Sequence, residues 1–307
     1  MSLLRINSSD HGLELHRSAQ QAGAALGFAA RQMRGTAPVV FMVHGYKFAP
    51  ADPRHCPHDH IFSTRQDHPC WKAMSWPRGL GATAPEAQML GIAFGWPARG
   101  SLRRAYARAQ VAGQDLAEAV RIVRRAAPER PVHILTHSLG ARVAFSALSA
   151  LEAGDICRVV MLTAAEFTGA ARTAATTPCG RATEMLHITS RENALFDHLL
   201  RWGMKPPAPR DLPMGLGGSV AQNVAQIHLH HDAVLHRLAT MGYPIADPAR
   251  RVCHWSVYLR EGVWPFYRAL VETPDQLPFG VLRGLEHLGA APAAPVPGIT
   301  GPHHLPV

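Results

Sequence analysis

The chain has 307 residues, a length that one α/β enzyme domain with insertions can use, and its hydrophobic fraction of 47% is ample for a sizeable core. No apolar run approaches the roughly 20 residues needed to cross a bilayer, which argues against stable membrane insertion. The formal net charge is +9, but the arginines that supply most of it are scattered along the chain, so the charge does not favour a nucleic-acid partner.

The first residues carry no charged leader followed by a long apolar segment, so we expect a cytoplasmic protein. The five cysteines are an odd number without the regular spacing of a disulfide framework. In a cytoplasmic protein they are expected to be free thiols.

The first predicted elements lead to a buried strand. Residues 1–7 have the pattern of a short strand, and the alanine-rich stretch 17–33 has helical composition. The apolar run that begins at Pro38 predicts a strand covered on both faces, as in a parallel sheet, and it leads directly into His44-Gly45-Tyr46. A backbone bend at that point can direct an N–H toward a reacting carbonyl, which would form one half of an oxyanion hole.

Residues 47–87 form a long insertion rich in proline, histidine, aspartate and tryptophan. Its clustered cysteines and histidines, at 55–60 and 68–70, could bind zinc, but no ligand pair is matched by a second pair at zinc-finger spacing. We therefore expect a rigid loop at the mouth of the active site, and no metal or other cofactor. The larger apolar side chains of the insertion are expected either to line an acyl pocket or to pack in the core: Phe48, Ile61, Phe62, Trp71 and Trp76.

The centre of the chain alternates strands with helices. Residues 89–97 predict a buried strand that ends at a proline, and residues 101–127 predict a helix because apolar residues recur at helical spacing. After this helix the apolar run 132–137 ends abruptly at Ser138, and a small-residue helical pattern extends from there to about Ala153.

The strand, turn and helix around Ser138 match a nucleophile elbow, in which a sharp turn exposes a serine hydroxyl above the carboxyl edge of a sheet. Strand and helix pass close together there, so small residues are needed two positions on either side of the serine. Gly140 meets this need after the serine, whereas Thr136 stands where glycine is usual before it. The alternative interpretation is an ordinary strand-to-helix turn with a serine N-cap.

The second half of the chain continues the alternation. Further strands are predicted at 156–162, 185–190 and about 225–230, and a final helix at 265–271. This order gives βαβ units and a mostly parallel sheet, whose chemistry gathers at the carboxyl ends of the strands. We expect one domain over residues 1–288 and a disordered, low-complexity tail over residues 289–307.

A serine hydroxyl is a poor nucleophile near neutral pH until an imidazole takes its proton, and the imidazole needs a carboxylate to fix its tautomer. In a sheet of this kind the three groups follow one another in the order serine, acid, histidine. Ser138 comes first, carboxylates at strand ends follow, and His254 comes late, in a loop before the last predicted helix. The order of these residues fits a catalytic triad.

These motifs resemble the α/β-hydrolase superfamily. They are similar to those of a poorly characterised bacterial branch of serine hydrolases, over about residues 36–272, and comprise His44-Gly45-Tyr46, Phe94-Gly95-Trp96-Pro97, Tyr106 and His137-Ser138-Leu139-Gly140. The resemblance implies a mostly parallel sheet of about eight strands with helices on both faces. It also implies cleavage of an ester, thioester or amide bond through an acyl-enzyme, without a cofactor.

Within this resemblance the acid of the triad is expected in the turn after the strand at 185–190, which offers Glu192. Two carboxylates remain as alternatives: Asp197, one helical turn further on, and Glu166, which ends the preceding strand. The aspartate that the family often has in this turn is missing, because Ala194 follows the asparagine.

His254 is preferred as the base over the other late histidines, which are His228, His230, His231 and His236. Those residues fall in or beside a predicted strand and helix, and adjacent side chains of a strand point to opposite faces. The sequence after His254 resembles the histidine loop of the superfamily. For the oxyanion hole we expect the backbone N–H groups of Leu139 and Tyr46.

The predicted reaction starts when Ser138 attacks the carbonyl of a small-molecule acyl ester or thioester, while His254 takes its proton and Glu192 stabilises the imidazolium. Water then releases the acid from the acyl-enzyme. Two alternatives use the same fold: an acyltransferase with the same serine, and a catalytically inactive binding protein. A zinc-dependent hydrolase built on the insertion is a third, and the sequence does not predict an oligomeric state.

Overall fold

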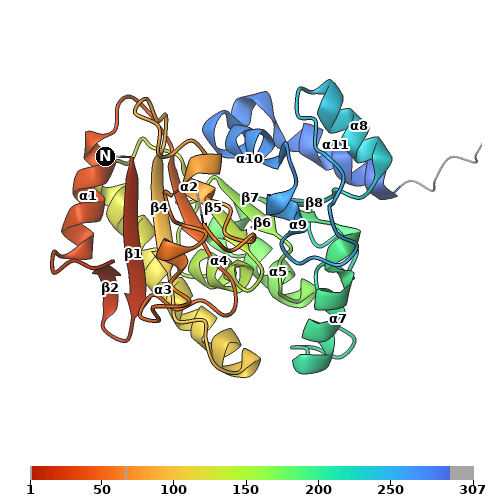
Figure 1. The fold of residues 1–307 in the computed structure, drawn as a ribbon, viewed down its shortest axis with the longest axis horizontal. Coiled ribbons are helices and arrows are strands. Elements are labelled where there is room, and N and C mark those ends of the chain that lie inside the picture. Colours follow the sequence, from red (N-terminus) through yellow and green to blue (C-terminus); the bar gives the residue numbers. More distant parts are fainter. Residues whose placement is uncertain (1, 66–67, 291–307) are drawn as a thin grey trace, which may run out of the picture.

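The computed structural model describes residues 2–65 and 68–290, and one eight-stranded sheet runs through it (Figure 1). The strands lie in the order β2-β1-β4-β3-β5-β6-β7-β8; β1 and β2 are antiparallel, and every other neighbouring pair is parallel. Their bounds are β1 (Leu3–Ser9), β2 (Gly12–Leu15), β3 (Val39–Val43), β4 (Leu90–Gly95), β5 (Val132–His137), β6 (Arg158–Leu162), β7 (Glu184–Thr189) and β8 (Val224–His228). The predicted mostly parallel sheet is confirmed.

The edge strand β2 is an addition to the predicted elements. It has four residues, and Gly12 at its start has a φ of +93°, a left-handed conformation that lets the chain reverse after β1. Its residues are only partly buried or exposed. It therefore lacks the continuous apolar run by which the inner strands are recognised in the sequence.

Helices cover both faces of the sheet (Figure 1). Along β3 the side chains alternate, so that Phe41 and Val43 belong to one buried cluster and Val40 and Met42 to a second. The first cluster includes residues of α1 (Ala22–Gln32), α3 (Leu102–Ala126), α4 (Gly140–Leu148), α5 (Thr168–Ala175) and α6 (Pro178–Arg181). The second includes residues of α2 (Trp76–Gly79), α8 (Asp232–Thr240), α9 (Ser256–Leu259), α10 (Val263–Glu272) and α11 (Phe279–Ala290).

Helix α3 begins and ends where its sequence indicates. The hydroxyl of Ser101, at the N-cap, accepts a hydrogen bond from the backbone N–H of Arg104 at 3.3 Å. Pro128 follows the last turn, where a further helical N–H would be needed. Helix α4 is shorter than predicted, because it ends at Leu148 instead of about Ala153.

The chain continues beyond the last predicted helix. Helix α10 corresponds to the helix expected at 265–271, and α11 follows it and buries Leu282 and Leu285 in the second cluster. The predicted tail therefore starts too early, because α11 reaches Ala290. Its remaining residues, 291–307, lie outside the described part of the chain.

The insertion at 47–87, described except for 66–67, packs onto the sheet. It contains a 3₁₀ turn, η1 (Pro57–Asp59), and helix α2. Ile61, Phe62 and Trp76 are buried in the second cluster, whereas Trp71 is exposed with its ring 6.0 Å from that of Trp255. Core packing therefore accounts for the three buried side chains, which the sequence left open as acyl-pocket residues.

Candidate active site

The nucleophile elbow forms between β5 and α4. Ser138 lies between them with a φ of +54°, a left-handed conformation that non-glycine residues seldom adopt. The end of β6 holds this turn on both sides: the Ser138 N–H donates to the carbonyl of Leu162 at 2.9 Å, and the Ala165 N–H donates to the carbonyl of Ser138 at 3.0 Å. Such surrounding hydrogen bonds are what a strained residue at a functional site needs in order to persist.

Two glycines allow the end of β3 to lie against the elbow. A Cβ atom on Gly45 would lie 2.7 Å from the Ser138 Cβ and 3.3 Å from the Leu139 nitrogen. A Cβ atom on Gly140 would lie 2.8 Å from the carbonyl oxygens of Val43 and His44. The small residue after the serine is therefore required by contact with β3, as the elbow pattern predicts.

His44 fixes the backbone that follows β3. The backbone N–H of Trp96 donates to its Nε2 at 2.9 Å, so the ring proton is on Nδ1, which donates to the carbonyl of Gly45 at 2.8 Å. Burial lowers the pKa of His44 to about 3, which keeps the ring neutral. The Gly45 carbonyl and the Tyr46 N–H belong to one planar peptide, so His44 also fixes the direction of that N–H.

The loop that carries His254 is anchored to the elbow. The backbone carbonyl of His254 accepts hydrogen bonds from Nε2 of His137 at 3.0 Å and from the hydroxyl of Thr163 at 3.3 Å. The ring of His254 lies 4.5 Å from that of His137 and is stacked on Phe196 at 4.8 Å. Because His137 directly precedes Ser138, these contacts bring the late histidine to the elbow.

The side chain that holds the His254 ring is Asn193. Its Oδ1 lies 2.6 Å from Nδ1 of His254, and its amide nitrogen donates to the carboxylate of Asp197 at 2.9 Å. The amide nitrogen of Asn193 faces Asp197, so its amide oxygen faces His254, and an amide oxygen only accepts. Nδ1 of His254 therefore carries the ring proton, and Nε2 keeps its lone pair.

The carboxylates predicted from the sequence lie elsewhere. Glu192, expected at the His254 ring, accepts hydrogen bonds from the hydroxyls of Ser190 and Ser256, and its backbone carbonyl accepts from the Cys253 N–H at 3.0 Å. The reason is the 3₁₀ turn η2 (Arg191–Asn193), which directs consecutive side chains to different sides. Glu192 thus anchors the histidine loop, while its neighbour contacts the ring.

The third candidate acid, Glu166, belongs to a different network. Its buried carboxylate accepts from Tyr106 at 2.6 Å, from Arg142 at 2.9 Å and from the backbone N–H of Phe167 at 2.8 Å. These bonds pair it with α3 and α4. The sequence predicts a carboxylate here, because a negative charge is the usual partner of a catalytic imidazole, although the Cys-His-Asn proteases show that an asparagine can also orient one.

The two histidines of the site are neutral at neutral pH. Burial, and then the neighbouring His137, hold the pKa of His254 well below its usual value of 6.5. Burial also lowers the pKa of His137 to about 4. A neutral His254 with a free Nε2 lone pair is in the form that a general base requires.

Among the described residues, no protein acceptor pairs with the backbone N–H of Leu139 or with that of Tyr46. Leu139 follows the serine, and Tyr46 follows the glycine that contacts it. Two free N–H groups, one after the serine and one after the glycine packed against it, are the kind of donors that an oxyanion hole requires.

Asp197 is buried between α7 (Ala194–Gly203) and the loop after it, and burial raises its pKa from 3.8 to about 7. The folded state therefore holds this proton to higher pH than the unfolded chain does, and stability is lost as the pH rises from about 4 through about 7. Between pH 5 and pH 8, with EDTA present, Asp197 alone is expected to subtract about 2–3 kcal/mol from the free energy of unfolding, against the gain that the buried neutral histidines contribute as the pH rises.

The variant Asp197→Asn keeps an acceptor for the Asn193 amide and is expected to lack this loss. Urea denaturation of both proteins at the two pH values measures the difference. If the free energy of unfolding changes by the same amount between the two pH values in wild type and in Asp197→Asn, the raised pKa of Asp197 is contradicted.

The sheet order, the elbow and the histidine that follows the last strand define an α/β-hydrolase fold. The sequence model of one protein family, described as alpha/beta hydrolase of unknown function (DUF900), matches residues 30–188, just over half of the chain. The protein belongs to this family. Comparison with curated proteins gives no match. Among the helices described, none has the length and apolar character to cross a membrane.

Proposed function

We propose that the protein is a serine hydrolase that cleaves a carboxylic ester or thioester through an acyl-enzyme on Ser138. The observation that supports this most directly is the anchoring of His254. Its backbone carbonyl accepts a hydrogen bond from His137, the residue before the serine, and its Nδ1 lies 2.6 Å from the amide oxygen of Asn193. This arrangement leaves Nε2 as the only ring atom free to take a proton.

In the proposed first step the Ser138 oxygen forms a bond to the substrate carbonyl carbon, and its proton passes to Nε2 of His254. The carbonyl oxygen becomes an oxyanion, which accepts from the N–H groups of Leu139 and Tyr46. When the tetrahedral intermediate collapses, the bond to the alcohol or thiol breaks, and the leaving group takes the proton from His254. Water then attacks the acyl-enzyme by the same sequence and releases the acid.

An asparagine beside Nδ1 of His254 stabilises the imidazolium less than a carboxylate would. A carboxylate would stabilise the imidazolium with a full negative charge, whereas the amide oxygen of Asn193 supplies a dipole. The nearest acid in this chain of hydrogen bonds is Asp197, on the far side of the amide. We therefore assign Asn193 to orientation of the ring and to selection of its tautomer.

Replacing Asn193 by alanine is expected to lower kcat/KM on the order of 100-fold, the cost of removing one oriented hydrogen bond from a transition state. Glu192→Gln is the matched control, because it changes the neighbouring residue and keeps an acceptor for Ser190 and Ser256. It is expected to stay within about threefold of wild type. If Glu192→Gln loses more activity than Asn193→Ala, the assignment of the ring partner is wrong.

The proposed function is tested first by reaction with a fluorophosphonate probe and then by hydrolysis of a panel of chromogenic esters and thioesters. Product analysis with an added alcohol distinguishes hydrolysis from acyl transfer, because only a transferase gives a new ester as its main product. A protein that neither reacts with the probe nor cleaves any ester would be a hydrolase fold used for binding.

A further inference from the structure

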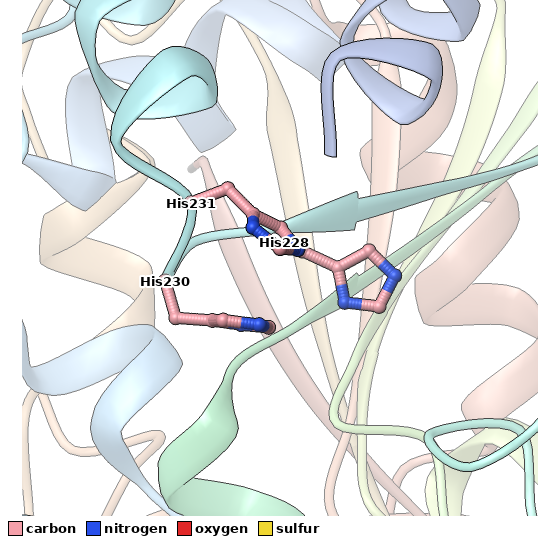
Figure 2. Close-up of side chains that lie close together, drawn as sticks. All are labelled: His228, His230 and His231. Carbon is pink, nitrogen blue, oxygen red and sulfur yellow. The ribbon is translucent and has the colours of Figure 1, made fainter. Parts of the chain in front are cut away.

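Three histidines converge at the carboxyl end of β8. His228 is the last residue of the strand, and His230 and His231 lie in the turn before α8, with their side chains directed back toward the strand end (Figure 2). Their ring centroids are 4.2–5.6 Å apart, and each ring has a nitrogen within 4.8 Å of a nitrogen of both others.

This convergence depends on where β8 ends. A strand that continued to residue 230, as the sequence predicts, would direct adjacent side chains to opposite faces. The strand stops at His228, and the N–H of His231 donates to the carbonyl of His228 at 3.2 Å, which closes a turn. Consecutive histidines in a turn can face the same point.

The cluster has the side-chain chemistry of a ligand set, because each of its three members is an imidazole. Neutral imidazoles keep a nitrogen lone pair, which is the donor that a transition metal binds.

The three rings line one cavity of about 380 Å³. Asp197 and Ser190 lie on its wall, and Gly215 contributes backbone. The cavity has room for an ion, its water ligands and a small molecule beside the rings. Three protein ligands with a fourth position open to a cavity is the arrangement of many reactive zinc sites, whereas structural sites are closed by a fourth protein ligand.

We propose that His228, His230 and His231 bind one divalent transition-metal ion, Zn²⁺ or Co²⁺, with its open coordination position facing this cavity. Three imidazole nitrogens suit these ions better than Mg²⁺ or Ca²⁺, which take oxygen ligands. In a tetrahedral site with bonds of about 2.0–2.1 Å the ligand nitrogens stand about 3.3 Å apart. The three nitrogens lie within 4.8 Å of one another, so rotation of the side chains would bring them to that spacing. Neither Ser138 nor His254 lines this cavity, although Asp197 on its wall accepts a hydrogen bond from Asn193, and the proposal does not depend on the proposed hydrolysis.

Metal binding has a specific cost at His230. The backbone N–H of Arg191 donates to its Nδ1 at 3.1 Å. Coordination through Nδ1 would take the lone pair that accepts this bond, and coordination through Nε2 would require the proton to move to Nδ1. In either case the Arg191 N–H loses its acceptor, which gives a readout at an atom that does not touch the metal.

The test uses untagged full-length protein, freed of metal with EDTA, and calorimetric titration with ZnCl₂. We expect one tight equivalent in wild type, and a loss of affinity of more than about 100-fold in His228→Ala and in His230→Ala. His236→Ala is the matched control, because it removes an exposed histidine one turn into α8, and it is expected to bind like wild type. Thermal unfolding without metal checks that each variant is folded.

A second variant separates this site from the other group of metal-binding side chains among the described residues, which is His16, Cys56 and Asp59. His16→Ala is expected to keep the tight equivalent. Amide hydrogen exchange at Arg191 is expected to accelerate on addition of Zn²⁺ in wild type and to stay unchanged in His230→Ala. Absence of a tight equivalent in wild type, or its retention in His228→Ala and His230→Ala, would overturn the proposal.

Discussion

Ser138→Ala is expected to abolish labelling by a fluorophosphonate probe and to lower ester hydrolysis on the order of 10⁴- to 10⁶-fold. Without the hydroxyl oxygen no acyl-enzyme forms, and only the oxyanion hole and substrate binding remain to assist a water molecule. The exchange removes one atom from a residue that lies against Gly45, so it leaves the packing of the elbow in place.

The matched control is Ser149→Ala, which removes an exposed hydroxyl at the end of α4. It is expected to label and hydrolyse like wild type. In-gel fluorescence after probe treatment and initial rates with a chromogenic ester measure both variants. Undiminished labelling of Ser138→Ala would show that the probe reacts with another residue, and the proposed nucleophile would be wrong.

His254→Ala is expected to lower kcat by a similar factor, about 10⁴ to 10⁶, because the serine proton then has no acceptor. The variant should fold, since the contacts that anchor the loop are made by its backbone carbonyl and survive the exchange. This separates a chemical effect from a structural one.

A time course of probe labelling and initial hydrolysis rates measure the effect of His254→Ala, and circular dichroism verifies the fold. His236→Ala again serves as the control on an exposed histidine. A folded His254→Ala protein that retains more than about a tenth of wild-type activity would contradict the role of this residue as the base.

The inner part of the fold could be predicted because its strands are apolar over their whole length. The runs that form β3, β4 and β5 are buried on both faces, and such runs are easily recognised in a sequence. The position of Ser138 could be predicted for a related reason: an apolar run that stops at a serine and continues with glycine and alanine has few other structural solutions.

The partner of the His254 ring could not be predicted in the same way. Glu192 and Asn193 are consecutive, and the geometry of a single 3₁₀ turn decides which of them faces the ring. The charge of the side chain favours Glu192, whereas the amide oxygen of Asn193 is the group that contacts the ring. Asp197, considered as an alternative acid, does take part in this network, but through the amide and without contact to His254.

The ends of helices and strands are also harder to predict than their central residues. Strand β8 stops at His228, two residues earlier than predicted, and this small difference turns three histidines that would point apart into a cluster. Periodicity identifies an element more reliably than its last residue, because the closing hydrogen bonds of a turn leave little trace in the sequence.

The family match runs from the last turn of α1 into β7, which includes Ser138 but neither Asn193 nor His254. Ribosomes make a polypeptide from its amino end, and the growing chain folds as it emerges. A nascent chain that has emerged only as far as β7 therefore carries the reactive alcohol without the imidazole that would activate it. On the proposed mechanism the enzyme stays inert throughout most of its own synthesis and gains its chemistry only when the last third of the chain has docked.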